Sequence, residues 1–88
     1  MKVVWTEYLR HRALTRGFEL AAIEHIVRSS QERYFDTATR RMVAIGRYRR
    51  GLVMVPYDRE NDTVTPVTIH ATTRQQTNFR VRTGRFQS

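Results

Sequence analysis

The sequence predicts an α+β domain in which two N-terminal helices pack on a twisted antiparallel sheet of three to five strands. Residues 1–29 contain two segments of helical periodicity, and the residues after them change to short extended runs separated by turn signals. Short runs joined by tight reversals are typical of antiparallel hairpins. Helices that precede such hairpins cover one face of the sheet, which is the arrangement of an α+β protein.

The N-terminal part predicts one short strand and two helices. Lys2–Trp5 has the character of a strand, and Glu7–Arg16 predicts a helix that ends at Gly17 in the C-terminal cap position. A second helix is expected over about Leu20–Ser29. Its apolar face is formed by Leu20, Ile23, Ile26 and Val27.

The rest of the chain predicts strands in short hairpins. Extended segments are expected over Arg33–Asp36, Met42–Arg49, Leu52–Asp58 and Val64–Thr72. Turn signals at Asp36–Thr39, Arg50-Gly51 and Arg59–Asp62 separate these segments. The last segment, Arg74–Arg82, fits either a short helix or a final strand, and Gly84 ends it.

Length and composition predict one soluble domain over residues 1–88. The chain suffices for a single small core, with 40% apolar and 27% charged residues. No apolar run approaches the roughly 20 residues of a membrane span, and no secretory signal is recognisable. The absence of cysteine excludes disulfides, thiolate zinc sites and a cysteine nucleophile. These features predict a cytoplasmic protein.

The charge of the chain predicts a polyanionic partner. The formal net charge is +8, and every basic residue except Lys2 is an arginine. The segment Thr63–Ser88 contains no Asp or Glu. Guanidinium groups keep their charge at any working pH and bind two phosphate oxygens at once, but they rarely move protons. Nucleic acid or an acidic protein is therefore the expected partner.

The first predicted helix places two arginines on its core-facing side. Its seam consists of Trp5, Leu9, Arg12 and Arg16. An arginine that faces inward needs a partner or an open cleft, because an unpaired buried charge is very costly. Two interpretations follow: the heads of Arg12 and Arg16 pair with Asp36, Asp58 or helix ends, or they line a cleft that binds phosphate.

His70 is the residue best suited to move a proton. In an alternating strand, Thr68 and His70 point to the side opposite Ile69. A single histidine on a strand is often a structural hydrogen-bonding residue, but a cation-rich surface favours the neutral imidazole that accepts protons. Metal-free RNA cleavage needs such a base, cations that stabilise the phosphorane and an acid for the leaving oxygen. His70 is suited to the proton transfer. The cations that would stabilise the charge are Arg12, Arg16, Arg74 and Arg80. The candidates for a second proton-transfer residue are Tyr8, Tyr48 and Tyr57.

A second basic region surrounds the predicted hairpin turn. Arg47, Tyr48 and Arg49 combine charge with an aromatic ring, which suits the binding of an RNA backbone and a stacked base, although such clusters are usually only solvent-exposed surface.

Metal and cofactor sites are not expected. The histidines have no ligand-like spacing, and the acidic loop after Asp58 lacks the glycine and terminal glutamate of a calcium-binding loop. No glycine-rich phosphate loop is present.

Three short motifs resemble a known family. They are Arg12-x-x-x-Arg16-Gly17-Phe18 before an Ile/Val-rich helix, Tyr34-Phe35-Asp36 before a hairpin, and Thr68-Ile69-His70 near the end. Together they resemble the small toxin-like proteins of the DUF4258 family, which are related in fold to RelE/ParE- and BrnT-type toxins and to the barnase–colicin–RelE ribonucleases. The resemblance spans nearly the whole chain. It implies a RelE-like fold, a metal-independent endoribonuclease and an acidic antitoxin partner that covers the basic cleft.

The resemblance assigns catalytic roles to three residues. Arg12 and Arg16 match the family's arginine pair, and His70 matches its late-strand histidine. The chain departs from the family at Tyr8, because relatives often carry a histidine at that place. Two other functions stay open: a non-catalytic module that binds RNA or the ribosome and its mRNA, and a ParE-like toxin that binds a protein target such as gyrase. Fold alone does not decide among them.

Overall fold

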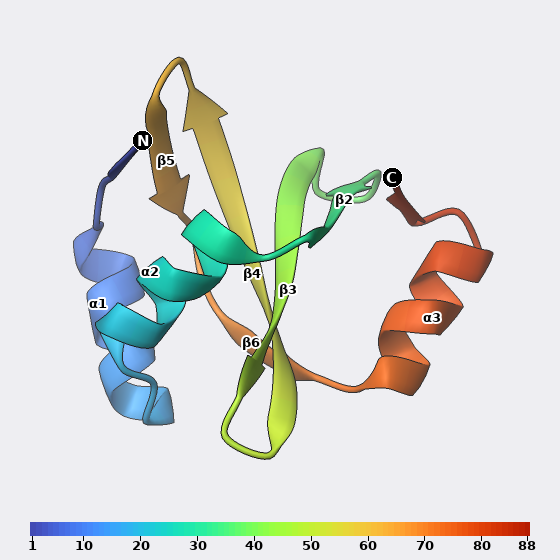
Figure 1. The fold of residues 1–88 in the computed structure, drawn as a ribbon, viewed down its shortest axis with the longest axis horizontal. Coiled ribbons are helices and arrows are strands. Elements are labelled where there is room, and N and C mark those ends of the chain that lie inside the picture. The colour runs from blue at the N-terminus through green and yellow to red at the C-terminus, as the bar shows by residue number, and fades with distance from the viewer.

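Three helices and a mixed seven-stranded sheet make up the computed structural model, which describes residues 1–88 (Figure 1). The helices are α1 (Glu7–Arg16), α2 (Leu20–Ser29) and α3 (Arg74–Arg82). The strands are β1 (Lys2–Val3), β2 (Glu32–Asp36), β3 (Arg41–Tyr48), β4 (Gly51–Glu60), β5 (Thr63–Pro66), β6 (His70–Thr72) and β7 (Phe86–Gln87). The α+β class agrees with the prediction. No helix has the length and apolar character needed to cross a membrane.

The sheet differs from the prediction in strand number and direction. Its order is β1-β5-β4-β3-β2-β7, with β6 paired to β4, and β1 runs parallel to β5. It is therefore mixed, with more than the predicted three to five strands. The expected strand Val64–Thr72 divides into β5 and β6, because Pro66 has no N–H for a ladder bond. The predicted N-terminal strand Lys2–Trp5 forms over Lys2–Val3 as β1, whereas the C-terminal strand β7 was not predicted and forms through its pairing with β2.

Side-chain caps define the ends of α1 and α3. The Thr6 hydroxyl accepts a hydrogen bond from the Leu9 N–H at 3.1 Å, and Gly17 ends α1 with φ of 77°. At α3, the Thr73 hydroxyl accepts from the Gln76 N–H at 3.0 Å. This cap decides between the two predictions for Arg74–Arg82, which forms a helix and not a strand.

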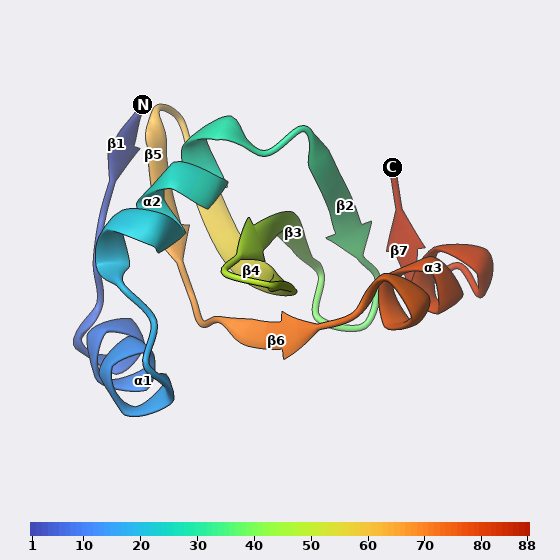
Figure 2. The same ribbon diagram turned by 60° about the horizontal axis from the view of Figure 1, so that its bottom comes forward.

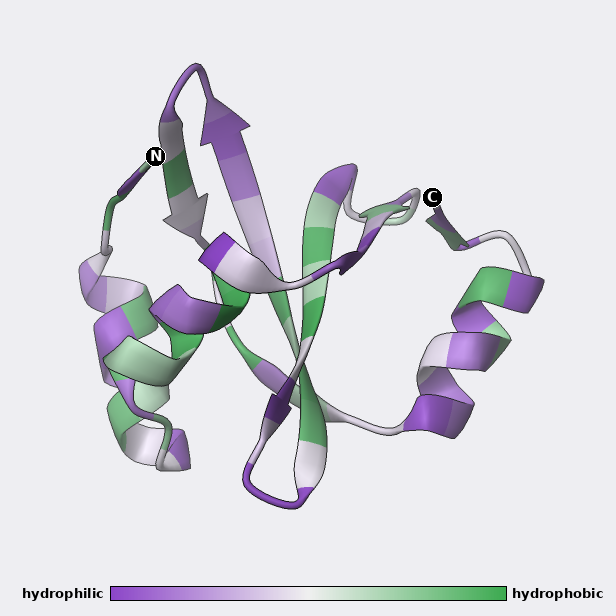
Figure 3. Ribbon diagram, viewed as in Figure 1, coloured by the Kyte–Doolittle hydropathy of each residue, from purple (hydrophilic) through white to green (hydrophobic).

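The sheet separates two apolar clusters. The larger cluster lies under α1 and α2 and includes Leu9, Ala13, Ile23, Ile26, Val53, Val55 and Ile69. The smaller cluster consists of Val43, Ile45, Met54 and Phe86. It takes the alternate residues of β3 and β4, so it lies on the opposite face of the sheet. Apolar residues concentrate along β3 and β4, whereas α3 is mostly hydrophilic (Figure 3).

The strand β6 connects the two sides of the molecule. It lies between α1 and α3 (Figure 2) and pairs with the first part of β4. His70 stands opposite Met54 in this pairing, so the two side chains share the face of the smaller cluster. The fold thus places the late histidine between α1 and α3.

Candidate functional site

His70 lines a cavity of about 450 Å³ on the face of the sheet beside α3. Met54 and Pro56 of β4 contribute its apolar wall, and Thr68, Gln76 and Arg80 are among its polar lining residues. The alternation predicted for this strand is present, because Ile69 is fully buried in the core while His70 is only half-buried. The imidazole is therefore accessible from the cavity.

Arg16 reaches His70 from the C-terminal end of α1. Its Nη1 donates to the Ile69 carbonyl at 2.8 Å and lies 3.0 Å from Nδ1 of His70. A guanidinium group can only donate, so Nδ1 accepts and the proton of the neutral imidazole resides on Nε2. The structure thus brings together Arg16 and His70, which the sequence singled out separately.

Arg12 and Arg80 complete a group of cations around the imidazole. The Arg12 guanidinium lies 5.4 Å from the centre of the Tyr8 ring, and its buried Nε has no hydrogen-bond partner. Arg80 lies 5.5 Å from the centre of the Phe86 ring, and its Nη1 is 3.2 Å from the sulfur of Met54. Neither guanidinium forms an ion pair with a carboxylate, and neither does that of Arg16.

Of the two interpretations of the helix arginines, the one that pairs them with Asp36 or Asp58 is wrong. Asp36 is 1% exposed and accepts from Arg85 at 3.1 and 3.2 Å, while Asp58 accepts from Arg41 at 3.0 Å. Burial opposes ionisation of Asp36, but the hydrogen bonds from Arg85 and the backbone outweigh it and hold the pKa of Asp36 below its ordinary value. These two carboxylates are therefore already neutralised by other arginines.

The environment keeps His70 neutral. Burial is the main cause that lowers the pKa of His70, and the charges of Arg16, Arg12 and Arg80 lower it further. The charges of all three guanidinium groups therefore act on the imidazole. A proton added to His70 would be repelled by three guanidinium groups and would break the contact with Arg16.

We expect this depressed pKa to make the protein less stable in mild acid. Below the ordinary value of 6.5, the unfolded chain protonates His70 while the folded chain does not, so the free energy of unfolding falls as the pH falls. Urea unfolding at about pH 7.5 and about pH 5 should show a larger loss for the wild type than for His70→Gln. All other residues are common to the two proteins, so the comparison isolates the contribution of His70. Equal losses of unfolding free energy in the two proteins would contradict a depressed pKa of His70 in the folded state.

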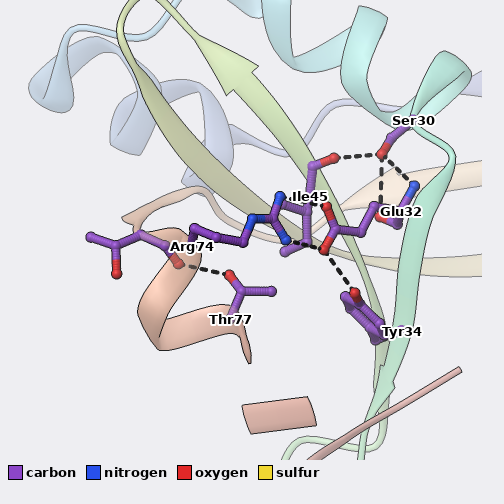
Figure 4. A network of polar contacts seen from close by, with 7 residues as sticks. Ser30, Glu32, Tyr34, Ile45, Arg74 and Thr77 are labelled. Carbon is purple, nitrogen blue, oxygen red and sulfur yellow. Dashed lines mark hydrogen bonds and ion pairs between the residues drawn. The ribbon is translucent and has the colours of Figure 1, made fainter. Parts of the chain in front are cut away.

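Arg74 has a different partner from the predicted phosphate. Its two terminal nitrogens donate to Glu32 at 2.6 and 2.8 Å, and the Tyr34 hydroxyl donates to the same carboxylate at 2.7 Å (Figure 4). The hydrogen bond from Arg74 is the main cause that holds the pKa of Glu32 below its usual range. In the free protein, Arg74 ties the start of α3 to β2.

The hairpin residues line a second hollow that adjoins the His70 cavity. Arg47, Arg50 and Arg74 line it together with Thr72, which also lines the His70 cavity. The two basic regions therefore meet at Thr72. Tyr48 is held elsewhere: Arg49 lies 5.2 Å from its ring centre, its ring packs edge-on against Phe18 and its hydroxyl donates to the Gly17 carbonyl at 3.2 Å.

None of the three tyrosines considered as a second proton-transfer group lines the His70 cavity. Tyr57 is buried beside Arg33, and Tyr8 is exposed on α1 next to Arg12. Sequence reasoning placed Thr68 on the same side of the strand as His70 but gave it no role. Thr68 is 9% exposed and lines the cavity, and its buried hydroxyl oxygen has no hydrogen-bond partner. Its position two residues before His70 is the signal that could have identified it.

No group of three His, Cys, Asp or Glu side chains is arranged to hold a metal ion.

Fold and site define an α+β protein with a cationic cleft around a neutral histidine. Comparison of the chain with protein-family models, curated proteins and solved structures finds no match. The resemblance to the DUF4258 family therefore stays a prediction from short motifs. A function for this chain must therefore be argued from the geometry and chemistry of its own residues.

Proposed function

We propose that this protein is a metal-independent endoribonuclease that holds the RNA backbone between α1, β6 and α3. One observation carries the proposal: Arg16 contacts the half-buried His70 and Arg80 lines the same cavity, and neither has a carboxylate partner. The charge of Arg12, which is also without a carboxylate partner, acts on the same imidazole. Unpaired guanidinium groups at one place are a binding site for a phosphate and for the charge that develops on a phosphorane. A neutral imidazole among them has the protonation state of a general base.

Phosphate binding would also prepare His70 for catalysis. In the free protein Arg16 occupies Nδ1, the only ring nitrogen that can accept a proton. A phosphodiester competes for this guanidinium with two charged oxygens, so Arg16 would move from the imidazole to the phosphate. Nδ1 of His70 would then accept the proton of a ribose 2′-hydroxyl. The 2′-oxygen bonds to phosphorus, the bond from phosphorus to the 5′-oxygen breaks, and water protonates the leaving oxygen.

We expect cleavage of single-stranded RNA in the presence of EDTA, with 2′,3′-cyclic phosphate ends. Removal of a general base lowers rates by about 10²- to 10⁴-fold, so His70→Ala should abolish the products. His25→Ala is the matched control, because His25 is exposed on α2 and does not line the cavity. Undiminished cleavage by His70→Ala, or cleavage that EDTA removes, would overturn the proposal.

A non-catalytic RNA-binding protein is the second candidate. It is favoured by the engagement of Nδ1 with Arg16 and by the position of every tyrosine outside the cavity. Salt-sensitive RNA binding without any cleavage product would select this function.

The cellular role that we propose is that of a cytoplasmic type II toxin acting on mRNA, free or on the ribosome. Support comes from the net charge of +8 and from the unpaired arginines, which an acidic antitoxin would cover. On this basis the same His70→Ala variant should lose the growth arrest that wild-type expression causes. Growth arrest that persists in this variant would instead favour a ParE-like action on a protein target.

A further inference from the structure

We propose that α3 presents a platform for an unpaired RNA base, so that the substrate of the cleft is single-stranded; this inference rests on the proposed function. Phe79 is 55% exposed although α3 is otherwise mostly polar. It lines a hollow of about 480 Å³ together with Gln76, Arg80 and Arg82. An exposed aromatic ring among arginines and amides offers a π-face beside phosphate ligands, which is the composition of single-strand binding sites.

This hollow is continuous with the His70 cavity. Gln76, Arg80 and Arg85 line both, so a base on Phe79 would belong to a nucleotide close to the phosphate held at His70. Arg82 lies 5.7 Å from the centre of the Phe79 ring, where its guanidinium plane can contact the same base. The hollow beside the β3–β4 turn adjoins the cavity on its other side at Thr72.

The three hollows form a track suited to a flexible polyanion. The only acidic residue among their lining residues is the buried Asp36, which Arg85 neutralises. The arginines are distributed along the whole track, whereas the aromatic platform stands at the α3 end. Bases of a duplex are already paired and stacked, so Phe79 can engage only a base that is unpaired or turned outward. This arrangement favours single-stranded RNA over an RNA duplex.

Binding of a 2′-O-methylated RNA of about 12 nucleotides, which lacks the attacking hydroxyl, tests the platform by fluorescence anisotropy. We expect the single strand to bind at least about tenfold more tightly than the same sequence in a duplex. Loss of one stacked base costs about 1–3 kcal/mol, so Phe79→Ala should weaken single-strand binding by about 5- to 150-fold. Phe79→Trp should retain the affinity.

Two controls separate stacking from folding and from charge. Val81→Ala removes another exposed apolar side chain of α3 that does not line the hollow, and we expect no change in affinity. Phe79→Ala should leave the dependence of affinity on salt unchanged, because it removes no phosphate contact. Competition by polyglutamate that depends on Phe79 as strongly as RNA binding does would overturn the inference in favour of an acidic protein partner.

The failures of the two proposals are distinguishable. Equal binding of single strand and duplex, with no effect of Phe79→Ala, would remove the platform and leave the proposed ribonuclease intact. Absence of both RNA cleavage and salt-dependent RNA binding in the wild type would remove the proposed function and the platform together.

Discussion

Replacing Arg16 and Arg80 together with glutamine is expected to lower the affinity for single-stranded RNA by at least about 100-fold. Hydrogen bonds to charged groups are worth about 1.5–3 kcal/mol each, and neither guanidinium has a carboxylate that would compete for it. Each lost phosphate contact should also reduce the slope of log K against log salt by about 0.7. Binding isotherms at several salt concentrations measure both effects.

The matched control is the double variant Arg10→Gln and Arg59→Gln. It lowers the net charge by the same amount, but neither residue lines the His70 cavity or is among the charges that act on the imidazole. By contrast, Arg16 contacts the imidazole and Arg80 lines the cavity. General attraction between a basic protein and RNA would weaken equally in the two double variants. The proposal requires that the Arg16/Arg80 double variant lose far more affinity for RNA than the control. Equal losses of affinity in the two double variants would contradict the proposal.

This expectation depends on how the carboxylates are distributed. Five acidic residues form ion pairs, and their partners are Arg28, Arg41, Arg74, Arg85 and the N-terminus. None of these pairs involves Arg12, Arg16 or Arg80, although Arg41 and Arg85, which also line the His70 cavity, are paired. Arg12, Arg16 and Arg80 therefore leave positive charge beside His70 that no carboxylate neutralises. Such uncompensated charge is costly for folding and is commonly a sign of a binding site.

The helices α1 and α2 were predictable because periodicity and capping are local. The bounds Glu7–Arg16 and the cap at Gly17 agree with the structure. The N-terminal strand was predicted over Lys2–Trp5 and forms over Lys2–Val3, but its parallel pairing with β5 was not predictable. The C-terminal strand β7 was missed, since it forms only where β2 offers an edge. Arg74–Arg82 stayed ambiguous for a similar reason: its apolar residues are few, and Thr77 is its only buried side chain.

The candidate site was predictable in its residue types and less so in its contacts. The seam argument selected Arg12 and Arg16, although the buried residues of α1 are Leu9 and Ala13 and the arginines flank them. The pairing of Arg74 with Glu32 joins residues 42 positions apart, and no sequence pattern indicates which arginine a distant carboxylate will bind. Long-range pairing removes Arg74 from the predicted phosphate ligands and leaves Arg80 free.

Gly46→Val is expected to be the most destabilising single substitution at a glycine of this chain. Gly46 lies in β3 beneath α2, and a Cβ atom there would stand 2.6 Å from Cγ1 of Ile26 and 2.9 Å from its Cδ1 and Cγ2. Ile26 is buried, and its β-branched side chain has few alternative rotamers. Overpacking of this kind costs about 1–3 kcal/mol or more, against a total stability of about 4–13 kcal/mol for a chain of this length.

Thermal unfolding measures this loss, since each kcal/mol lowers the Tm of a domain this small by about 4–8 °C. Gly51→Ala is the matched control, because nothing lies within 4 Å of a Cβ at Gly51, and we expect a change of about 0.5 kcal/mol or less. The double variant Gly46→Val with Ile26→Ala should recover stability relative to the sum of the single losses, because the alanine vacates the space that the valine enters. Additive losses in this cycle would show that the contact between α2 and β3 is not what excludes a side chain at Gly46.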